Sequence, residues 1–277
     1  MSIKKRLNFA FRYLTGGLRA LPDFIIIGEA RCGTSSLYKY ITSHPQVIPA
    51  FRIEVHFFDV GYSLGLNWYR AHFPVRFWMK VLEMLRGSKV ITGEKSPYYM
   101  FHPHAPRRIA KLIPHVKLIA LLRNPVDRAY SLYQLRRRRG LELLTFEEAI
   151  EREKRLIPSE TEKMLHDENY NSIEHRRYSY ISRGIYIKSL SRWFQFFPRE
   201  QFLILKSENL FENPNNLMQR VFDFLNIRRF EEIEYVKYHE GKYPEMNPRT
   251  RRELVEFYRP YNEELQKLLG QNFNWYE

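Results

Sequence analysis

The sequence predicts a single α/β domain, with a central parallel sheet flanked by helices and a P-loop-like loop after the first strand. Two observations support this prediction. Strand-like and helix-like segments alternate along the chain, which is the pattern of a parallel sheet covered by helices. A glycine-framed loop also follows the first apolar run, residues 24–28, and ligands of such folds bind outside the carboxyl ends of the strands.

The first strand is predicted at residues 24–28, because a short and continuous apolar run is typical of a strand that is buried on both faces. A helix is predicted to follow the loop and to end before Pro45. Thr34 or Ser35 is expected to cap that helix, because their hydroxyl groups can accept hydrogen bonds from its first N–H groups.

Later segments repeat the same alternation of strand and helix. Residues 116–122 predict a second buried strand, and Asn124 predicts the cap of the helix that follows. The capping box at residues 145–148 predicts a short connecting helix. Residues 201–206 predict a third strand, and residues 213–214 predict the start of another helix.

Residues 1–22 are predicted to form an N-terminal amphipathic appendage to the main domain, residues 23–277. Its apolar side chains fall at helical spacing among basic residues, and they are Leu7, Phe11, Leu14 and Leu18. We expect this stripe to pack on its own domain, and peripheral contact with a membrane is the alternative.

The chain is basic, with 45 Lys and Arg against 31 Asp and Glu and a net charge of +14. This excess suggests an anionic partner, such as a nucleic acid, an acidic membrane, a phosphate-rich small molecule or a glycan. No zinc-finger spacing, RNA-binding signature or basic zipper is present, so no nucleic acid is expected. Taken alone, the run at residues 136–139 is typical of a solvated basic surface.

Composition also bears on the compartment. No apolar stretch approaches the roughly 20 residues that span a bilayer, so no transmembrane segment is expected. The single cysteine, Cys32, excludes internal disulfides. Polar and basic residues interrupt any signal-peptide core near the N-terminus, and the protein is therefore predicted to be cytoplasmic.

The loop at residues 28–35 has the G-x-x-x-x-G frame of a phosphate-binding loop. A nucleoside triphosphatase needs a lysine after the second glycine, whereas this chain has Thr34. The strand at residues 116–122 runs into Arg123 instead of a metal-binding aspartate, and an arginine binds an anion. Both departures disfavour a P-loop nucleotide kinase and favour a metal-free ligand with phosphates at two places.

Residues 24–36 resemble the 5′-phosphosulfate loop of sulfotransferases that use 3′-phosphoadenosine 5′-phosphosulfate (PAPS), and residues 123–131 resemble their 3′-phosphate motif. Residues 54–59, 93–97 and 241–246 resemble the glycosaminoglycan branch, which includes heparan sulfate O- and N-sulfotransferases. The resemblance implies that residues 23–277 form a sulfotransferase domain with PAPS as co-substrate and without a metal.

The resemblance also implies roles for individual residues. Glu54 is implied to be the general base, with His56 shaping the acceptor end, and Lys95 to offset charge near the transferred sulfonate. Arg31 is implied to stabilise the leaving phosphate, because a guanidinium cannot give up a proton at working pH. The implied donor contacts are Arg31, Gly33, Thr34, Ser35 and Ser36 at the 5′ end, Arg123 and Ser131 at the 3′-phosphate, and Lys242 in a late loop.

Several residues keep alternative interpretations. Glu54, His56 and Asp59 include metal-ligand types, but their short spacing predicts no common face, and we expect no metal there. Cys32 is expected to be a small filler, and Arg128 is either a phosphate contact or an ion-pair partner. Arg183 and Tyr186 either contact ligand or pack, and four aromatic residues either stack on sugars or lie in the core, namely Trp68, Tyr69, Tyr98 and Tyr99.

The function predicted is the transfer of a sulfonate from PAPS to a hydroxyl of a carbohydrate or glycolipid, with an amine as the second choice. The charge suggests that this acceptor is anionic. The rivals are a nucleotide kinase and a basic protein that binds nucleic acid or glycan without catalysis. The second rival would leave Glu54 and Lys95 without a catalytic use.

Overall fold

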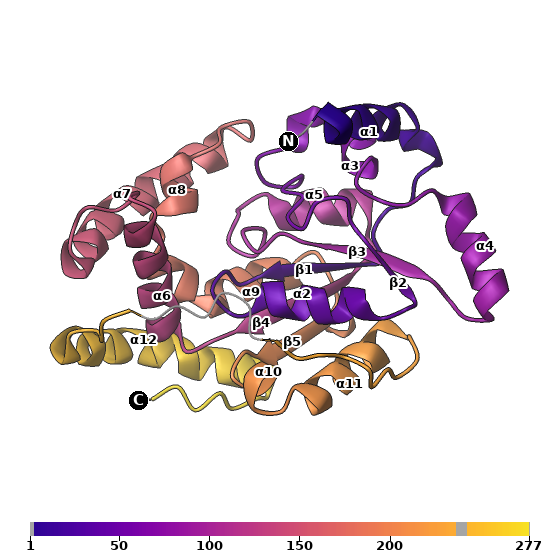
Figure 1. The fold of residues 1–277 in the computed structure, drawn as a ribbon. Helices are drawn as coiled ribbons and strands as arrows, with labels where there is room; N and C mark the ends of the chain where they lie inside the picture. Colours follow the sequence, from indigo (N-terminus) through magenta and orange to yellow (C-terminus); the bar gives the residue numbers. More distant parts are fainter. Residues whose placement is uncertain (1–2, 237–242, 277) are drawn as a thin grey trace.

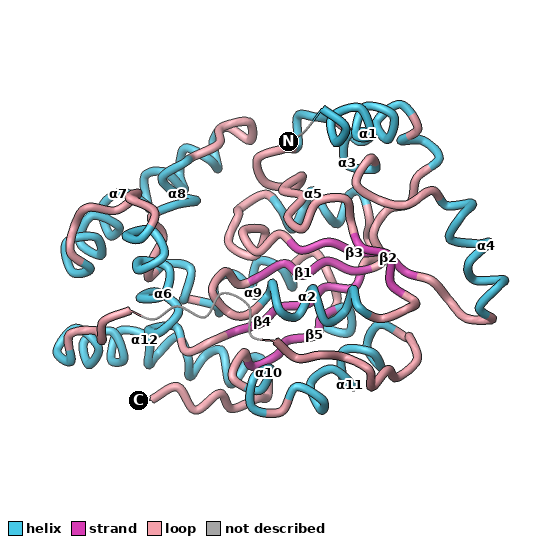
Figure 2. The backbone as a smooth tube through the Cα atoms, in the orientation of Figure 1, coloured by secondary structure: helices cyan, strands magenta, loops and turns pink. Residues whose placement is uncertain are grey.

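The computed structural model describes residues 3–236 and 243–276, and it contains one five-stranded parallel sheet (Figures 1 and 2). The strand order is β2-β3-β1-β4-β5, so the first strand lies in the centre. The strands are β1 (Phe24–Gly28), β2 (Val47–Pro49), β3 (Ile91–Lys95), β4 (Lys117–Leu122) and β5 (Phe202–Lys206). β3 and β4 flank β1: the connection after β1 leads to β2 and β3 on one side of it, and the connection after β3 crosses to β4 on the other side.

Helices cover both faces of the sheet (Figure 1). Core contacts place α2, α10 and α11 on one face, and α5, α6, α9 and α12 on the other. The α-helices of the described residues are α1 (Ile3–Leu14), α2 (Thr34–Ser43), α3 (Leu66–Arg70), α4 (Arg76–Arg86), α5 (Ala105–Leu112), α6 (Pro125–Arg138), α7 (Phe146–His166), α8 (Ile173–Arg177), α9 (Tyr186–Phe194), α10 (Asn209–Glu212), α11 (Pro214–Leu225) and α12 (Pro248–Leu269).

The three strands predicted from apolar runs are confirmed. In β1, Ile25 and Ile27 pack into one core and Phe24 and Ile26 into the other, and all four side chains are fully buried. Because a parallel strand covered on both faces has no solvent side, its sequence is continuously apolar.

Two strands, β2 and β3, were not predicted. β3 has no apolar run, since Thr92, Glu94 and Lys95 follow Ile91 in a segment that also contains Gly93. All five residues of β3 are nevertheless buried. Polar residues can enter a sheet interior only with hydrogen-bond partners, and those partners come from distant parts of the chain.

The helix starts agree with the sequence in most places. The Asn124 side chain accepts a hydrogen bond from the backbone at the start of α6, and Asn213 does the same for α11. The capping box of Thr145 and Glu148 is present. The helix that it opens, α7, has 21 residues, so the prediction of a short helix was wrong.

The predicted cap of α2 was also wrong. Its N-cap is Gly33, with a left-handed φ of 84°, and neither Thr34 nor Ser35 caps the helix because both lie inside it. The first turn of α2 therefore has no side-chain cap, and its N–H groups face the loop that precedes it.

Helix α1 contacts the domain with a different face from the one expected. Phe9 packs against His72, with ring centroids 5.0 Å apart, and Arg12 donates to the carbonyl oxygens of Ala71 and Phe73. The stripe that includes Leu7 is exposed, so the expectation that it packs on the domain was wrong. No helix of the described residues is long and apolar enough to cross a bilayer. The domain boundary after residue 22 stays a prediction.

Candidate active site

The loop between β1 and α2 forms an anion cradle at the carboxyl end of the central strand. Gly33 combines a φ of 84° with close packing, because a Cβ there would lie 3.0 Å from the Cδ2 atom of Leu210. A side chain at this position would both strain the backbone and push the loop out of place. The uncapped N-terminus of α2 opens into the same loop, which is the arrangement that binds phosphate groups in proteins.

Lys95 connects this loop to the predicted base. It lies at the end of β3, and its register partner Ile26 lies in the strand that carries the loop. The Lys95 Nζ atom donates to Ser35 Oγ at 2.8 Å and to Glu54 Oε1 at 2.6 Å, and the lysine is only 2% exposed. The structure thus brings together three predicted site residues from separate segments.

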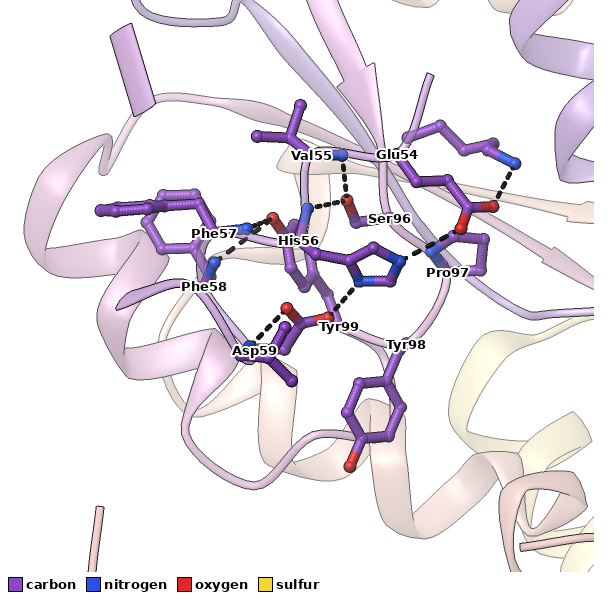
Figure 3. Close-up of polar contacts among 12 residues, drawn as sticks. Glu54, Val55, His56, Phe57, Phe58, Asp59, Ser96, Pro97, Tyr98 and Tyr99 are labelled. Carbon is purple, nitrogen blue, oxygen red and sulfur yellow. Dashed lines mark hydrogen bonds and ion pairs between the residues drawn. The ribbon is translucent and has the colours of Figure 1, made fainter. Parts of the chain in front are cut away.

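Glu54, His56 and Asp59 form a hydrogen-bonded row (Figure 3). His56 Nε2 lies 3.1 Å from Glu54 Oε2, and Nδ1 lies 2.6 Å from Asp59 Oδ2. The expectation that these side chains share no common face was wrong, because a left-handed φ of 57° at His56 turns the chain between the two carboxylates. Within residues 3–236 and 243–276, no cluster of metal-ligating side chains is suited to hold an ion.

The charges of this row follow from its geometry. Burial lowers the pKa of His56, but hydrogen bonds to Asp59 and Glu54 outweigh burial and raise it to about 10. Burial raises the pKa of Glu54, whereas the hydrogen bond from His56 and the charge of Lys95 bring it down to about 2. At neutral pH, His56 is therefore protonated and Glu54 is ionised.

A buried network that the sequence analysis missed supports the row. The backbone N–H groups of Val55 and His56 donate to Ser96 Oγ at 3.2 and 3.0 Å (Figure 3). Ser96 Oγ in turn donates to Glu94 Oε2 at 2.8 Å. Tyr69 donates to the other oxygen of Glu94 at 2.8 Å, and burial raises the pKa of Glu94 to about 7. The motif at residues 93–97 was the signal that could have indicated this role.

The four aromatic residues considered for sugar stacking have different environments. Tyr69 and Tyr99 are fully buried, and the Tyr99 hydroxyl accepts from the Phe57 N–H at 2.7 Å, so both serve the core (Figure 3). Trp68 packs near α1, with its ring 6.1 Å from that of Phe9. Tyr98 belongs to the cavity lining, but it is only 4% exposed and its hydroxyl is hydrogen-bonded to His175 Nδ1 at 2.7 Å.

The two predicted phosphate motifs meet at Arg31. Its Nε atom donates to Ser131 Oγ on α6 at 3.0 Å, and Arg123 Nη1 donates to the Arg31 carbonyl at 3.4 Å. Ser36 is fully buried in α2 and lies outside the lining of the main cavity. Lys242 lies outside the described residues.

Cys32 and Tyr186 both lie in the packed interior of the domain. Cys32 is fully buried, and burial raises the pKa of its thiol to about 12, which agrees with the expectation of a small filler. The Tyr186 hydroxyl donates to the carbonyl of Arg123 at 2.8 Å, and its ring is buried, so Tyr186 packs beneath the site.

The two buried arginines have different partners. Arg128 is buried, donates to the carbonyl of Tyr180 and makes no ion pair among the described residues, so the ion-pair role is not observed and the phosphate contact stays a prediction. Arg183 pairs with the buried Glu29 of the loop, and it also lines the main cavity.

The main cavity has a volume of about 650 Å³ and begins at the anion cradle. Among the lining residues that belong to the described part of the chain, Glu54 is the single carboxylate. The cations that line it are Arg31, Lys95, Arg136, Arg138, Arg139, Arg176, Arg177 and Arg183. Three of the four arginines at residues 136–139 therefore line the cavity, so the interpretation of this run as a solvated basic surface was incomplete. Arg137 is the exception, because it donates to the Leu143 carbonyl instead.

Comparisons with known proteins identify this architecture. The family model described as "Sulfotransferase domain" matches residues 21–264. Human heparan sulfate glucosamine 3-O-sulfotransferase 3A1 is 31% identical over 95% of this chain, which spans 64% of that relative's length. The bifunctional heparan sulfate N-deacetylase/N-sulfotransferase 1 of Caenorhabditis elegans is 28% identical over 92% of this chain and 30% of its own.

A solved structure agrees with these matches. The crystal structure of a sulfotransferase from Alicyclobacillus acidocaldarius has a TM-score of 0.68 and 28% identity, covering 93% of this chain and all of its own. Sulfotransferase STF9 from Mycobacterium avium, at 13% identity and a TM-score of 0.52, shares the fold. Sequence, architecture and the matched residues agree, and the chain belongs to the sulfotransferase family.

Proposed function

We propose that this protein transfers a sulfonate group from PAPS to a hydroxyl of an anionic carbohydrate or glycolipid. The observation that carries the proposal is the pair of contacts made by Lys95, which bridges the anion cradle at Ser35 and the carboxylate of Glu54. A donor anion bound in the cradle would therefore lie on one side of the buried Lys95 cation, and Glu54, the base for the acceptor, lies on the other side.

The described residues fit such a donor. The uncapped N-terminus of α2 and the side chains of Arg31, Thr34 and Ser35 offer N–H, guanidinium and hydroxyl donors around one anionic group. Arg123 and Ser131 lie next to Arg31 and would hold the second phosphate. When bound, PAPS supplies an electrophilic sulfur and a phosphate leaving group.

Glu54 is the base in this proposal, and His56 is a positioning residue. A protonated His56 has no free lone pair to accept a proton, whereas Glu54 is ionised and 44% exposed toward the cavity. The acceptor proton goes to a Glu54 oxygen as the acceptor oxygen bonds to sulfur. The bond from sulfur to the 5′-phosphate oxygen breaks, and that oxygen keeps the electron pair.

Lys95 couples the two halves of the reaction. Its charge lowers the pKa of Glu54 in the structure. A donor anion near Ser35 would also interact with Lys95 and would partly neutralise the effect of that charge on Glu54. The proton affinity of Glu54 would then rise when the donor is in place. Lys95 and Arg31 offset the negative charge that develops on the leaving phosphate oxygen.

The cavity lining supports an anionic acceptor. Arg138, Arg139, Arg176 and Arg177 are contributed to the lining by α6, α8 and the residue that follows α6. These cations exceed what a donor with two phosphate positions needs. The relatives named for heparan sulfate also support a carbohydrate.

The reaction is tested with radiolabelled PAPS and a panel of glycans, glycolipids and simple phenols. We expect transfer to a glycan or glycolipid, and Glu54→Gln should lower turnover by at least about 100-fold while leaving PAP affinity unchanged. Glu253→Gln, an exposed change of the same kind on α12, should have no effect. Normal turnover by Glu54→Gln would exclude Glu54 as the base, and transfer to phenols alone would exclude a carbohydrate acceptor.

The acceptor site has its own test. Arg138→Ala should raise KM for an acidic glycan about ten-fold, because it removes a charge-assisted contact, and should leave kcat nearly unchanged. Arg137→Ala is the matched control, since Arg137 belongs to the same run but not to the cavity lining. Equal effects of both variants would assign the binding to general surface charge.

A further inference from the structure

Helices α1 and α4, which lie at the edge of the molecule (Figure 1), carry exposed apolar side chains that do not line the cavity. Helix α1 exposes one continuous stripe of side chains, Ile3, Leu7, Phe11 and Leu14, which are 78%, 68%, 64% and 81% exposed. Helix α4 exposes a second stripe, and its members are Phe77, Trp78, Met84 and Leu85. Soluble surfaces rarely leave this many large apolar side chains exposed on two helices.

The two helices are held in place by the domain. The opposite side of α1 packs through Phe9 and Arg12, as described above, so the stripe points outward on an anchored helix. The start of α4 is tied to the segment after α1, because Arg76 Nη2 donates to the Gly17 carbonyl at 2.8 Å and Ala20 N–H donates to the Pro74 carbonyl at 2.9 Å. Both stripes are thus fixed parts of one end of the molecule.

Charge selects the kind of partner that fits this surface. Lys4 and Arg6 border the α1 stripe on its two sides by helical periodicity, and both are exposed. Residues 1–22 contain no Asp or Glu. Arg76 and Lys80 are the exposed cations of the first turns of α4. The α1 stripe has cations on both flanks and no carboxylates, so it complements a layer that is apolar inside and anionic at its surface. Helix α4 carries one carboxylate, Glu83, among its cations.

We propose that α1 and α4 form a docking surface for a bilayer that contains anionic lipids. The 12 residues of α1 extend about 18 Å, which is too short to cross the roughly 30 Å hydrocarbon core, so the helix lies along the interface. The side chains of Phe77 and Trp78 are of the kind that settles at the level of the headgroups. The cavity and the bilayer surface are separate sites, and this proposal does not depend on the proposed reaction.

The test is flotation of the full chain with vesicles of phosphatidylcholine alone or with phosphatidylserine added. We expect binding to the mixed vesicles, weaker binding in 1 M salt, and a loss of about ten-fold or more in partitioning for the double variant Leu7→Glu with Phe11→Glu. The matched control is Leu143→Glu with Leu165→Glu, two exposed leucines far from α1. Thermal melting of each variant establishes that it is folded.

Tryptophan fluorescence locates the contact. Trp78 is the exposed tryptophan of the described residues, and its emission should shift to the blue on mixed vesicles and be quenched by brominated lipid, whereas Trp78→Phe should lose this response. Equal partitioning of the two double variants would overturn the proposal. A dimer in light scattering that becomes a monomer in the Leu7→Glu and Phe11→Glu variant, with no vesicle binding by either, would assign the surface to a second copy of the chain.

Discussion

The charge of His56 offers a prediction that can be worked through from the structure. Asp59 and Glu54 raise the pKa of His56 from 6.5 to about 10 against the effect of burial. The Asp59 carboxylate is wholly buried and lies 2.6 Å from Nδ1, whereas Glu54 is 44% exposed and lies 3.1 Å from Nε2. Asp59 therefore contributes the larger part of the increase.

Replacing Asp59 by asparagine removes this charge and keeps the shape. We expect the pKa of His56 to fall by about two pH units, which is the typical effect of one buried opposite charge at this distance. The asparagine amide would donate to Nδ1, and this favours the neutral ring with its proton on Nε2, where it still reaches Glu54. The His56 ring of the variant would then titrate near pH 8, within the range that can be followed, and that of the parent near pH 10.

The raised pKa of His56 also makes the stability of the folded protein depend on pH. Because the pKa of His56 is higher in the folded protein, its stabilising contribution is fully present below pH 6.5 and is lost as the pH rises through about 10. Asp59→Asn should therefore lower stability at pH 6 and reduce its dependence on pH between 7 and 10.

Nuclear magnetic resonance of the histidine rings measures this directly, with His56→Gln to assign the signal. His56 should stay in its charged form from pH 5 to 8.5, whereas burial lowers the pKa of His72 and His175 to about 3, so these rings should stay neutral. Asp223→Asn is the control, because that carboxylate is exposed and paired with an arginine elsewhere. A midpoint near 6.5 in the parent, or an unchanged midpoint in Asp59→Asn, would refute the reasoning.

Three further predictions concern the donor site. Arg123→Ala should weaken PAP about ten-fold more than adenosine 5′-monophosphate in calorimetry, because only PAP carries the 3′-phosphate, and equal weakening would contradict that role. Gly33→Ala should lower the free energy of unfolding by about 1–3 kcal/mol and weaken PAP, whereas Gly270→Ala, which is also left-handed with a φ of 61° but faces open space, should cost less. Lys95→Met should raise the pKa of Glu54 from about 2, which carboxyl resonances would reveal, and no change would exclude their coupling.

Much of the frame followed from local rules of the sequence. The apolar run of β1, the glycine at position 33 and the Asn124 cap are each dictated by neighbouring residues, since strand burial, left-handed turns and helix starts are local properties. Arg123 in place of a metal-binding aspartate was also visible in the sequence. These features were enough to predict the parallel sheet and the position of the anion cradle, whereas the family was predicted from the resemblance of several motifs to known sulfotransferases.

Contacts between residues that are distant in sequence could be seen only in the tertiary structure. β3 could not be predicted because Glu94 and Lys95 look like surface residues until Tyr69, Ser35 and Glu54 meet them in space. The exposure of Phe11 on α1 was equally invisible, since periodicity defines a stripe but not the side that the domain covers. Hydrogen bonds and packing between residues distant in sequence set the charge of His56 and the direction of that stripe, because the free energy of burying a group depends on what surrounds it.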